Sequence, residues 1–483
     1  MPLIFGDDKM AVYSIVKLSE LEGAKRIDAE YYKPEYLALK LKIEKYSSHN
    51  LKEIAYITDG SHEIRSYQEK GVLFLRSQDI FEIGLIVQEP AYISKEEDLT
   101  LKRSKPELND ILVTKTGNVG ASLVVDEVFP NCNLPADIAL IRIKNRSFNP
   151  YFLATFLNSR IGRGLIFREL TGCGRPRVVL DNLKELRIPK LPTDIQNSIE
   201  LLIKEVYKQK RLSESLYSQA ENLLLEELGF KDFKPKYKKT YNAKLSDAFS
   251  AHRIDAEYFQ PAYEEVIEKL KGRAIVEKLK NIASFINHGK QPYYVENGDI
   301  PVLIQKHLGS QLLRLHSEIL NMPDTPKTDR NFIEKYREYL IKPFDILFYS
   351  VGAYLGRTNV VLENFEAVPA SFITLIRTKQ EVCNPVYIAL FLNSEIGQLQ
   401  SSRWKSASAQ QYIYPKEIKE FIVPLLPLST QQKIASLVQQ SHEARKRAKE
   451  LIEIAKRAVE IAIEKNEEEA KREVEEAIEE EIK

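Results

Sequence analysis

The chain contains 483 residues, of which 43% are hydrophobic and 29% charged, and its formal net charge is +1. No run approaches the roughly 18 apolar residues of a membrane-spanning helix, and the opening MPLIFGDDKM lacks the pattern of a signal peptide. The cysteines Cys132, Cys173 and Cys383 are far apart and odd in number, which argues against a disulfide framework and a paired-cysteine metal site and favours a cytoplasmic protein.

The first 192 residues are predicted to form a mixed α and β domain. Short apolar runs between turn residues predict strands at 51–57, 72–80, 110–115, 121–126 and 139–144. A helix is predicted over 149–167, because Asn149 can cap it and Pro150 suits its first position.

A long helix is predicted next, between Pro192 and Gly229, where the sequence has no Gly or Pro. Its seam positions recur at spacings of four and three, the heptad rhythm of a helix that pairs with another helix. They are Ile195, Ile199, Leu202, Val206, Gln209, Ser213, Leu216, Ala220 and Leu223. At 1.5 Å per residue such a rod would be about 54 Å long.

The rest of the chain repeats this organisation. Residues 26–36 (RIDAEYYKPEY) return as 253–263 (RIDAEYFQPAY) with eight of eleven residues identical, and 149–162 return as 384–397 with nine of fourteen identical. Strands are predicted at 279–286, 301–305, 345–350, 358–362 and 372–377, and a helix over 384–400. The repeated unit is therefore a globular domain followed by a long helix.

The second long helix is predicted to run without interruption from Ser429 to Lys483. Its seam is rich in small residues, which would allow two backbones to approach closely. Those positions are Ile434, Leu437, Ser441, Ala444, Ala448, Leu451, Ala455, Ala458 and Ala462. We expect an antiparallel coiled coil of the two long helices. The alternative is that they are ordinary core helices of separate domains.

The sequence offers no convincing catalytic or metal-binding motif. It has no Gly-rich cofactor loop, no phosphate loop and no metal-spaced cluster of Cys and His. Asn149-Pro-Tyr-Phe and Asn384-Pro-Val-Tyr resemble an amino-methyltransferase motif, but helix capping explains them better. The Gly-containing stretches 117–120 and 352–356 are better explained as tight turns between paired strands than as phosphate loops. We expect no metal and no catalytic residue.

These features together resemble the specificity subunit of type I restriction–modification systems. The resemblance rests on the duplicated RIDAEY segments, the two N-P-x-[FY] helices that contain FLNS, and the step from 189–192 or 424–427 into a long helix with Gln196 or Gln431 near its start. It implies an α+β fold of two pseudo-repeated target recognition domains separated by the coiled coil. The expected segments are 1–192, 193–230, 231–428 (a linker and the second domain) and 429–483.

The resemblance implies a subunit that reads a bipartite target in double-stranded DNA and does no chemistry itself. Its expected partners are modification (methyltransferase) subunits, in two copies, and restriction or translocase subunits. S-adenosylmethionine, ATP and Mg would bind those partners, with no cofactor in this chain. The helical pair would act as a ruler of about 54 Å, or about 16 base pairs. The rival hypotheses are a coiled-coil scaffold that does not recognise DNA and a degenerate methyltransferase or nuclease.

Polar residues that differ between matching loops of the two copies are the candidates for DNA contact, since two half-sites differ in sequence. Arg suits guanine, Gln suits adenine and Lys suits phosphate. In the first copy the candidates are Arg65, Tyr67, Arg76, Gln78, Lys115, Asn118, Arg175 and Arg177. In the second copy they are Lys290, Tyr293, Gln305, Lys306, His307, Tyr354, Arg357, Lys405, Gln410 and Gln411. Residues kept in both RIDAEY segments are expected to be structural.

Overall fold

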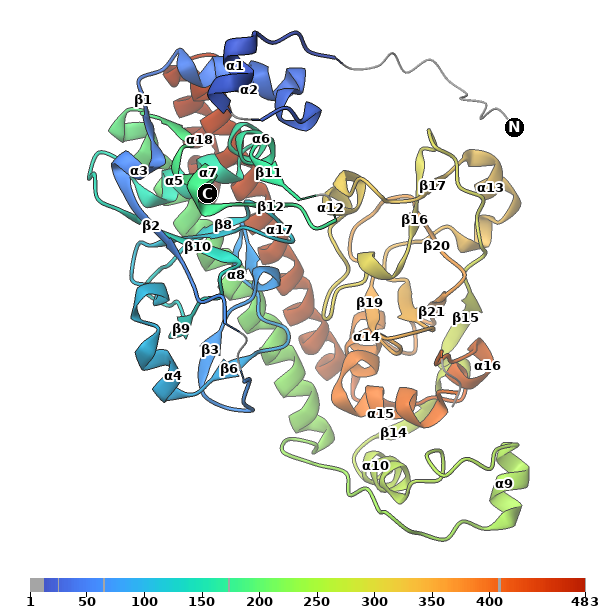
Figure 1. Cartoon of the computed structure of the whole chain (residues 1–483). Coiled ribbons are helices and arrows are strands. Elements are labelled where there is room, and N and C mark those ends of the chain that lie inside the picture. Colours follow the sequence, from blue (N-terminus) through green and yellow to red (C-terminus); the bar gives the residue numbers. More distant parts are fainter. Residues whose placement is uncertain (1–12, 25, 64–65, 173, 407–409, 483) are drawn as a thin grey trace, which may run out of the picture. The chain divides into compact units, whose positions relative to one another are not determined.

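The computed structural model describes residues 13–24, 26–63, 66–172, 174–406 and 410–482 (Figure 1). The chain divides into two compact units, one formed by residues 1–210 and 447–483 and the other by residues 211–446. Each unit contains one copy of the repeat and one part of each long helix, α8 (Thr193–Leu228) and α17 (Leu428–Glu464).

The first unit is built on an antiparallel four-stranded sheet in the order β2–β10–β7–β8, with bounds Ala55–Asp59, Ile138–Ile143, Ile111–Thr114 and Ser122–Val124. A second sheet has the order β6–β3–β9 (Tyr92–Ile93, Val72–Phe74, Cys132–Asn133). The pairs are β1–β13 (Ser48–Asn50, Arg187–Pro189), β4–β5 (Ile80–Phe81, Gly84–Leu85) and β11–β12 (Leu170–Thr171, Arg177–Val178). The helices before α8 are α1 (Leu18–Ala24), α2 (Pro34–Glu44), α3 (Leu51–Ile54), α4 (Lys95–Thr100), α5 (Pro150–Asn158), α6 (Arg160–Arg168) and α7 (Leu180–Lys184).

The second unit repeats the strand order of the four-stranded and three-stranded sheets and one strand pair of the first unit. Its four-stranded sheet has the order β15–β21–β18–β19 (Ala283–His288, Ile373–Thr378, Ile346–Tyr349, Thr358–Val360). A smaller sheet has the order β17–β16–β20 (Lys327–Thr328, Ile300–Leu303, Val368–Pro369), and β14 (Ile275–Lys278) pairs with β22 (Ile422–Leu425). The helices are α9 (Leu245–Ala251), α10 (Pro261–Lys271), α11 (Leu279–Ile282), α12 (His316–Asn321), α13 (Arg330–Lys335), α14 (Pro385–Asn393), α15 (Glu395–Trp404) and α16 (Pro415–Ile418). The shared strand order confirms the predicted duplication and the mixed α and β class.

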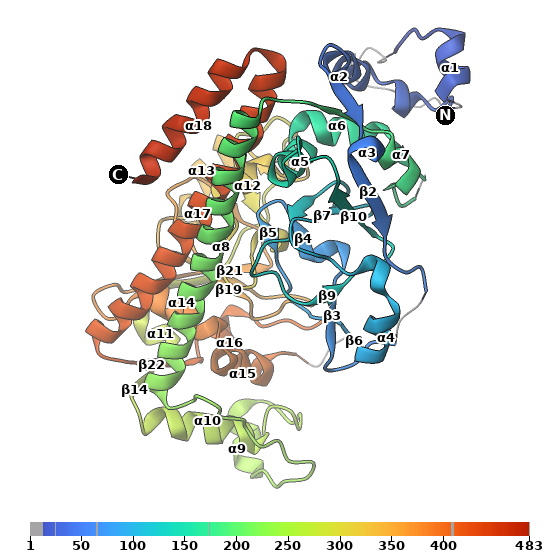
Figure 2. The same ribbon diagram turned by 90° about the vertical axis from the view of Figure 1, so that its left-hand side faces the viewer.

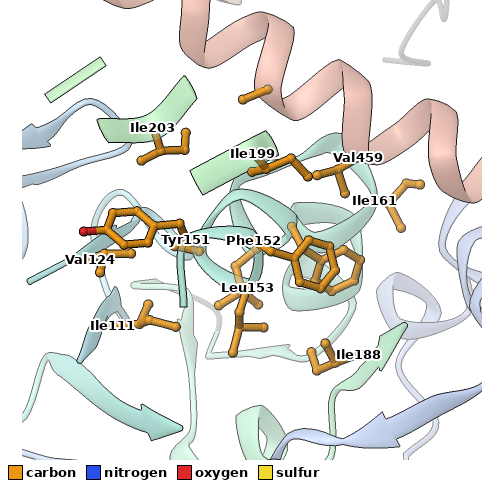
Figure 3. Close-up of a cluster of buried hydrophobic side chains, with 14 of the residues drawn as sticks. Ile111, Val124, Tyr151, Phe152, Leu153, Ile161, Ile188, Ile199, Ile203 and Val459 are labelled. Atoms are coloured by element: carbon orange, nitrogen blue, oxygen red, sulfur yellow. The ribbon is translucent and has the colours of Figure 1, made fainter. Parts of the chain in front are cut away.

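The two long helices pack against each other within each unit (Figure 2). In the first unit Ile199 of α8 and Val459 of α17 lie in one buried cluster, which also contains Leu153 of α5 (Figure 3). In the second unit the hydroxyl groups of Ser213 and Ser441 lie 3.1 Å apart. Early residues of α8 thus meet late residues of α17, and later residues of α8 meet earlier ones of α17, which is the antiparallel order.

The buried stripe on each long helix is wider than the predicted seam. Besides seam residues such as Leu202, the first unit buries Ile203 and Tyr207 of α8 in the core formed by its sheet and α5. The second unit likewise buries Tyr217 and Leu224 with the core of its own domain. Helix pairing and membership in a domain core, posed as alternatives from the sequence, therefore occur together.

The last predicted helix is interrupted. It ends at Glu464, and α18 (Glu467–Ile482) begins after a short turn. Arg457 lies 3.2 Å from Glu473, whereas the earlier Arg447 donates to the carbonyl of the later Ala477. α18 therefore runs back along α17 and buries an apolar face of Ala470, Val474 and Ala477. This glutamate-rich helix packs on the first unit because its small apolar residues recur at helical spacing.

The predicted helices over 149–167 and 384–400 are also wrong in one respect, because each is two helices. The side chain of Ser159 accepts a hydrogen bond from the Gly162 amide at 3.2 Å, and Ser394 accepts one from Gly397 at 3.3 Å. Each serine is thus the N-cap of a new helix, α6 or α15. A Cβ at Gly162 would lie 1.9 Å from the Phe156 carbonyl oxygen, so the tight corner requires glycine.

The strands predicted to begin at Leu51 and Leu279 begin later. Residues 51–54 and 279–282 form the short helices α3 and α11, and the strands follow from Ala55 and Ala283. In the first unit the Asn50 amide donates to the Glu53 carboxylate at 3.1 Å, a local capping arrangement that competes with strand formation.

The glutamine near the start of each long helix fastens that helix to its domain. The Gln196 side chain accepts from the Asn149 amide at 2.7 Å and donates to the Leu191 carbonyl at 2.8 Å. Gln431 accepts from the Asn384 amide at 2.8 Å and donates to the Leu426 carbonyl at 2.7 Å. Both glutamines are buried. We call this pair of hydrogen bonds the glutamine bracket. Because it holds each long helix to its domain, it explains why both repeats retain the glutamine.

Candidate nucleic-acid interface

The turn between β7 and β8 gathers several candidates in the first unit. Gly117 and Gly120 have φ of 70° and 82°, which confirms a tight glycine turn. Asn118 is exposed at this turn. The β11–β12 hairpin joins it, because the Val178 amide donates to the Lys115 carbonyl at 3.1 Å and a backbone bridge links Thr116 with Arg177.

Exposed side chains of this hairpin and of a neighbouring segment share the same region. Arg175 and Arg177 are both exposed. The segment holding Arg76 and Gln78 lies beside the turn, since the Ser77 hydroxyl is 3.5 Å from that of Thr116. Gln78 is exposed, whereas the Arg76 side chain donates to the Glu89 carbonyl. Polar groups from three loops are therefore brought together at one place.

Lys115 does not point freely to solvent as a phosphate contact would. Its ammonium group donates to the Asp59 carboxylate at 2.6 Å, and both side chains are only 10% exposed. Arg103 and His62 lie 3.7 and 3.8 Å from the same carboxylate. The charge of Lys115 is therefore engaged within the domain.

Tyr67 and Arg65 complete the candidates of the first copy. Tyr67 is 57% exposed, and its ring lies 6.2 Å from that of Phe74. Arg65 lies outside the described residues. The sequence did not identify Asp59 or Arg103 as partners of the candidate residues. Asp59 is the last residue of β2, so a strand predicted to extend to 59 would have placed it at the strand end.

The matching turn of the second unit joins β18 to β19. Tyr354 is 53% exposed on it, and the guanidinium carbon of Arg357 lies 4.1 Å from the centre of the Tyr354 ring. The Gly352 amide donates to the Gln411 carbonyl at 2.8 Å. Gln410 and Gln411 are exposed beside this turn, while Lys405 is half-buried where the same segment begins.

Arg357 also links the turn to the segment that carries Gln305. It donates to the Leu308 carbonyl at 3.1 Å, and burial lowers the pKa of its guanidinium. Gln305 is exposed. Lys306, by contrast, forms an ion pair of 2.5 Å with Asp324.

His307, another candidate for DNA contact, is held inside the second unit. Its side chain is fully buried, with Nδ1 accepting from the Ile304 amide at 3.1 Å and Nε2 lying 3.2 Å from the Thr325 hydroxyl. Burial and the nearby cations Lys306 and Arg314 lower its pKa to about 4. The ring is therefore neutral near pH 7. It connects the Ile304 amide with the Thr325 hydroxyl inside the domain.

Lys290 and Tyr293 are exposed in another loop of the second unit. The Lys290 ammonium lies 5.8 Å from the centre of the Tyr336 ring, and the Tyr293 hydroxyl donates to Asp329 at 2.6 Å. Among the described residues, no group of three or more His, Cys, Asp or Glu could hold a metal ion.

The two units place different chemistry at one structural position. In the first sheet Asp59 pairs across from Ala139 and contacts Lys115. In the second sheet His288 pairs across from Thr374. The Thr374 hydroxyl lies 3.0 Å from His288 Nδ1 and 2.6 Å from the Ser350 hydroxyl. An ion pair in one unit is thus replaced by a chain of neutral groups in the other, a difference that sequence comparison of the repeats could have found.

Comparison with known proteins adds three findings. Residues 263–455 match the model of the type I restriction modification DNA specificity domain. Over 154 residues, or 32% of this chain, the sequence is 29% identical to the type I restriction enzyme EcoBI specificity subunit of Escherichia coli. The chain covers about one third (32%) of the length of that relative.

Two solved structures are similar over 87% of this chain. The type I restriction–modification S subunit from M. genitalium gives a TM-score of 0.46 at 13% identity, with 96% of that chain covered. The HsdS subunit from Thermoanaerobacter tengcongensis gives a TM-score of 0.28 at 16% identity, with 97% of that chain covered. Among the described residues, no helix is long and apolar enough to cross a membrane.

Proposed function

We propose that this chain, whose residues 263–455 are a type I restriction modification DNA specificity domain, reads a bipartite target in double-stranded DNA. The duplicated topology extends the assignment to the first unit, because both units have the same strand order in their main sheet. Each unit would read one half of the target.

The observation that carries this proposal is that the two units share their framework but differ in the side chains exposed beside the matching turns. The domains keep the same sheet, glycine turns and helix brackets, yet they present different side chains beside the matching turns. The first unit presents Asn118, Arg175 and Arg177, and the second presents Tyr354, Gln410 and Gln411. Arginine and glutamine can form paired hydrogen bonds with guanine and adenine, so two such sets suit two different half-sites.

The chain would work as a recognition subunit without chemistry of its own. Two modification subunits would carry out methyl transfer with S-adenosylmethionine, and restriction or translocase subunits would use ATP and Mg. The paired helices would set the gap between half-sites. Because these partners and DNA meet there, we propose a cytoplasmic location.

Selection from a library of random duplexes tests this proposal. The chain is incubated with the library, alone and with a modification subunit of a type I restriction–modification system, and retained duplexes are sequenced after a gel shift. Enrichment of a split motif with a fixed gap is the expected result. Binding without a motif would favour a scaffold, and DNA cutting or methyl transfer by the chain alone would favour an enzyme.

Exchanging domain segments sharpens the test. Residues 51–180 are replaced by the matching segment of another chain of this family, and the selection is repeated. We expect one half of the motif to change and the other half to persist. A change in both halves would overturn the assignment of one half-site to each unit.

A further inference from the structure

The segment that carries the candidate DNA-reading side chains is tied down at its downstream end in both units. In the first unit the Val178 amide donates to the Lys115 carbonyl at 3.1 Å. In the second unit the Ile413 amide donates to the Ser350 carbonyl at 3.0 Å. The Thr116–Arg177 bridge in the first unit and the bond from the Gly352 amide to the Gln411 carbonyl in the second lie beside them. These contacts fix where each segment ends relative to the sheet.

The upstream end is held by the arginine of the duplicated RIDAEY motif. Arg26 donates to the Leu170 carbonyl at 2.8 Å, just beyond α6. Arg253 donates to the carbonyls of Trp404 and Lys405 at 3.1 and 3.0 Å, at the end of α15. Both arginines therefore reach about 150 residues along the chain (144 for Arg26 to Leu170) to the same structural position.

An aspartate two residues later holds each arginine in a fixed orientation. Arg26 forms two hydrogen bonds of 2.8 Å with the Asp28 carboxylate. Arg253 forms the matching pair with Asp255 at 2.7 and 2.9 Å. Such two-pronged pairing fixes the plane of a guanidinium group, and lysine cannot reproduce it.

A tyrosine and a second arginine complete the arrangement. Tyr31 is buried, with the guanidinium carbon of Arg26 at 4.5 Å and that of Arg168 at 3.7 Å from its ring centre. The corresponding distances from Tyr258 are 4.8 Å for Arg253 and 4.7 Å for Arg403. We call each set of two arginines, the aspartate and the tyrosine a clip.

The clips are kept while the segments they hold differ. Residues 170–172 read LTG and the matching 405–407 read KSA, and Arg175 and Arg177 have Gln410 and Tyr412 in the matching positions. The same contacts therefore hold segments of different sequence in the two units. Their role is to give different reading side chains the same starting point relative to the sheet.

We propose that Arg26 and Arg253 are positioning residues that set the approach of these segments to DNA, each for one half-site. The inference rests on the function proposed above. Neither arginine touches DNA in this scheme. Each acts through the carbonyl groups that it holds.

Hydrogen–deuterium exchange and duplex selection together test the proposal, using the full chain with its modification subunit. The variants are Arg26→Ala, Arg253→Ala, and Arg26→Lys, which keeps the charge and is the variant to use if alanine prevents folding. In Arg26→Ala we expect exchange of 170–178 to accelerate about tenfold or more while 405–413 stays unchanged. One half of the selected motif should lose base preference by a similar factor. Arg253→Ala should show the reciprocal pattern.

The outcomes separate this inference from the proposed function. Unchanged exchange at 170–178 in both Arg26 variants, or equal loss of preference in both half-sites, would overturn the positioning role. Local acceleration of exchange with no motif selected even by the unaltered chain would overturn the proposed function, and with it the role in reading DNA. A purely structural role would lower the melting temperature without a change confined to one half-site.

Discussion

Replacing Glu82 with Gln should destabilise the first unit by about 3 kcal/mol near neutral pH. Glu82 follows β4, and its carboxylate is 2.5 Å from Lys449 and 3.2 Å from Lys456 of α17. Burial opposes its ionisation, but the two lysines outweigh burial and lower the pKa of Glu82 to about 2 from 4.5. A shift of about 2.5 pH units corresponds to about 3 kcal/mol at 1.36 kcal/mol per unit. The glutamine would also leave two half-buried ammonium groups with less compensation.

The contribution of Glu82 depends on pH in a definite direction. Because the folded pKa lies below the usual value, the stabilisation is complete above about pH 4.5 and is lost as pH falls from there toward 2. The difference between the unaltered chain and Glu82→Gln should therefore shrink over that range.

Hydrogen exchange of first-unit peptides in a urea series measures this difference without interference from the second unit. The matched control is Glu185→Gln, which removes a 2.5 Å pair with Lys52 whose side chains are 55% and 49% exposed. That change should cost well under about 1 kcal/mol. The reasoning is refuted if Glu82→Gln costs no more than this control, or if its effect is the same at acid pH.

Three further predictions follow from other contacts. Gln431→Leu should lower the stability of the second unit by about 2–4 kcal/mol, because it breaks two buried hydrogen bonds; calorimetry should show no loss if the bracket is unimportant. Burial depresses the pKa of His307 to about 4, so the free energy of unfolding of the second unit should fall as pH falls from about 6.5 toward 4. In His307→Gln, urea titration should show a smaller fall of that free energy over the same pH range. Deleting two heptads from each long helix together should shorten the gap of the selected motif or abolish assembly, and an intact complex with an unaltered gap would contradict the ruler.

Repetition made much of the fold predictable from the sequence. Matching segments around Arg26 and Arg253 exposed the duplication, and the absence of Gly and Pro marked the long helices. The breaks after Asn158 and Asn393 are hard to predict, because the serine that caps the next helix lies within an apolar run and no proline marks the corner. The turn between α17 and α18 was missed because no Gly or Pro marks it.

The candidate interface was predictable only in part. Exposed residues such as Asn118 and Arg177 could be placed from their turns. Lys115 and His307 could not, because the partners that engage them, Asp59 and Thr325, are distant in sequence or hidden by folding. The sequence of a loop does not show whether a polar side chain has a hydrogen-bond partner within the domain. Only the folded structure shows which residues are paired in this way.

The bracket formed by Gln196 and Gln431 has a consequence for how such chains diversify. Each globular domain is anchored to its long helix through main-chain groups, because the amides of Asn149 and Asn384 donate to the side chains of Gln196 and Gln431. Main-chain groups exist whatever the neighbouring sequence is. A foreign domain joined at the prolines before a long helix would therefore keep this bracket, but it would also have to bury the apolar face of that helix, as the first unit buries Ile203 and Tyr207.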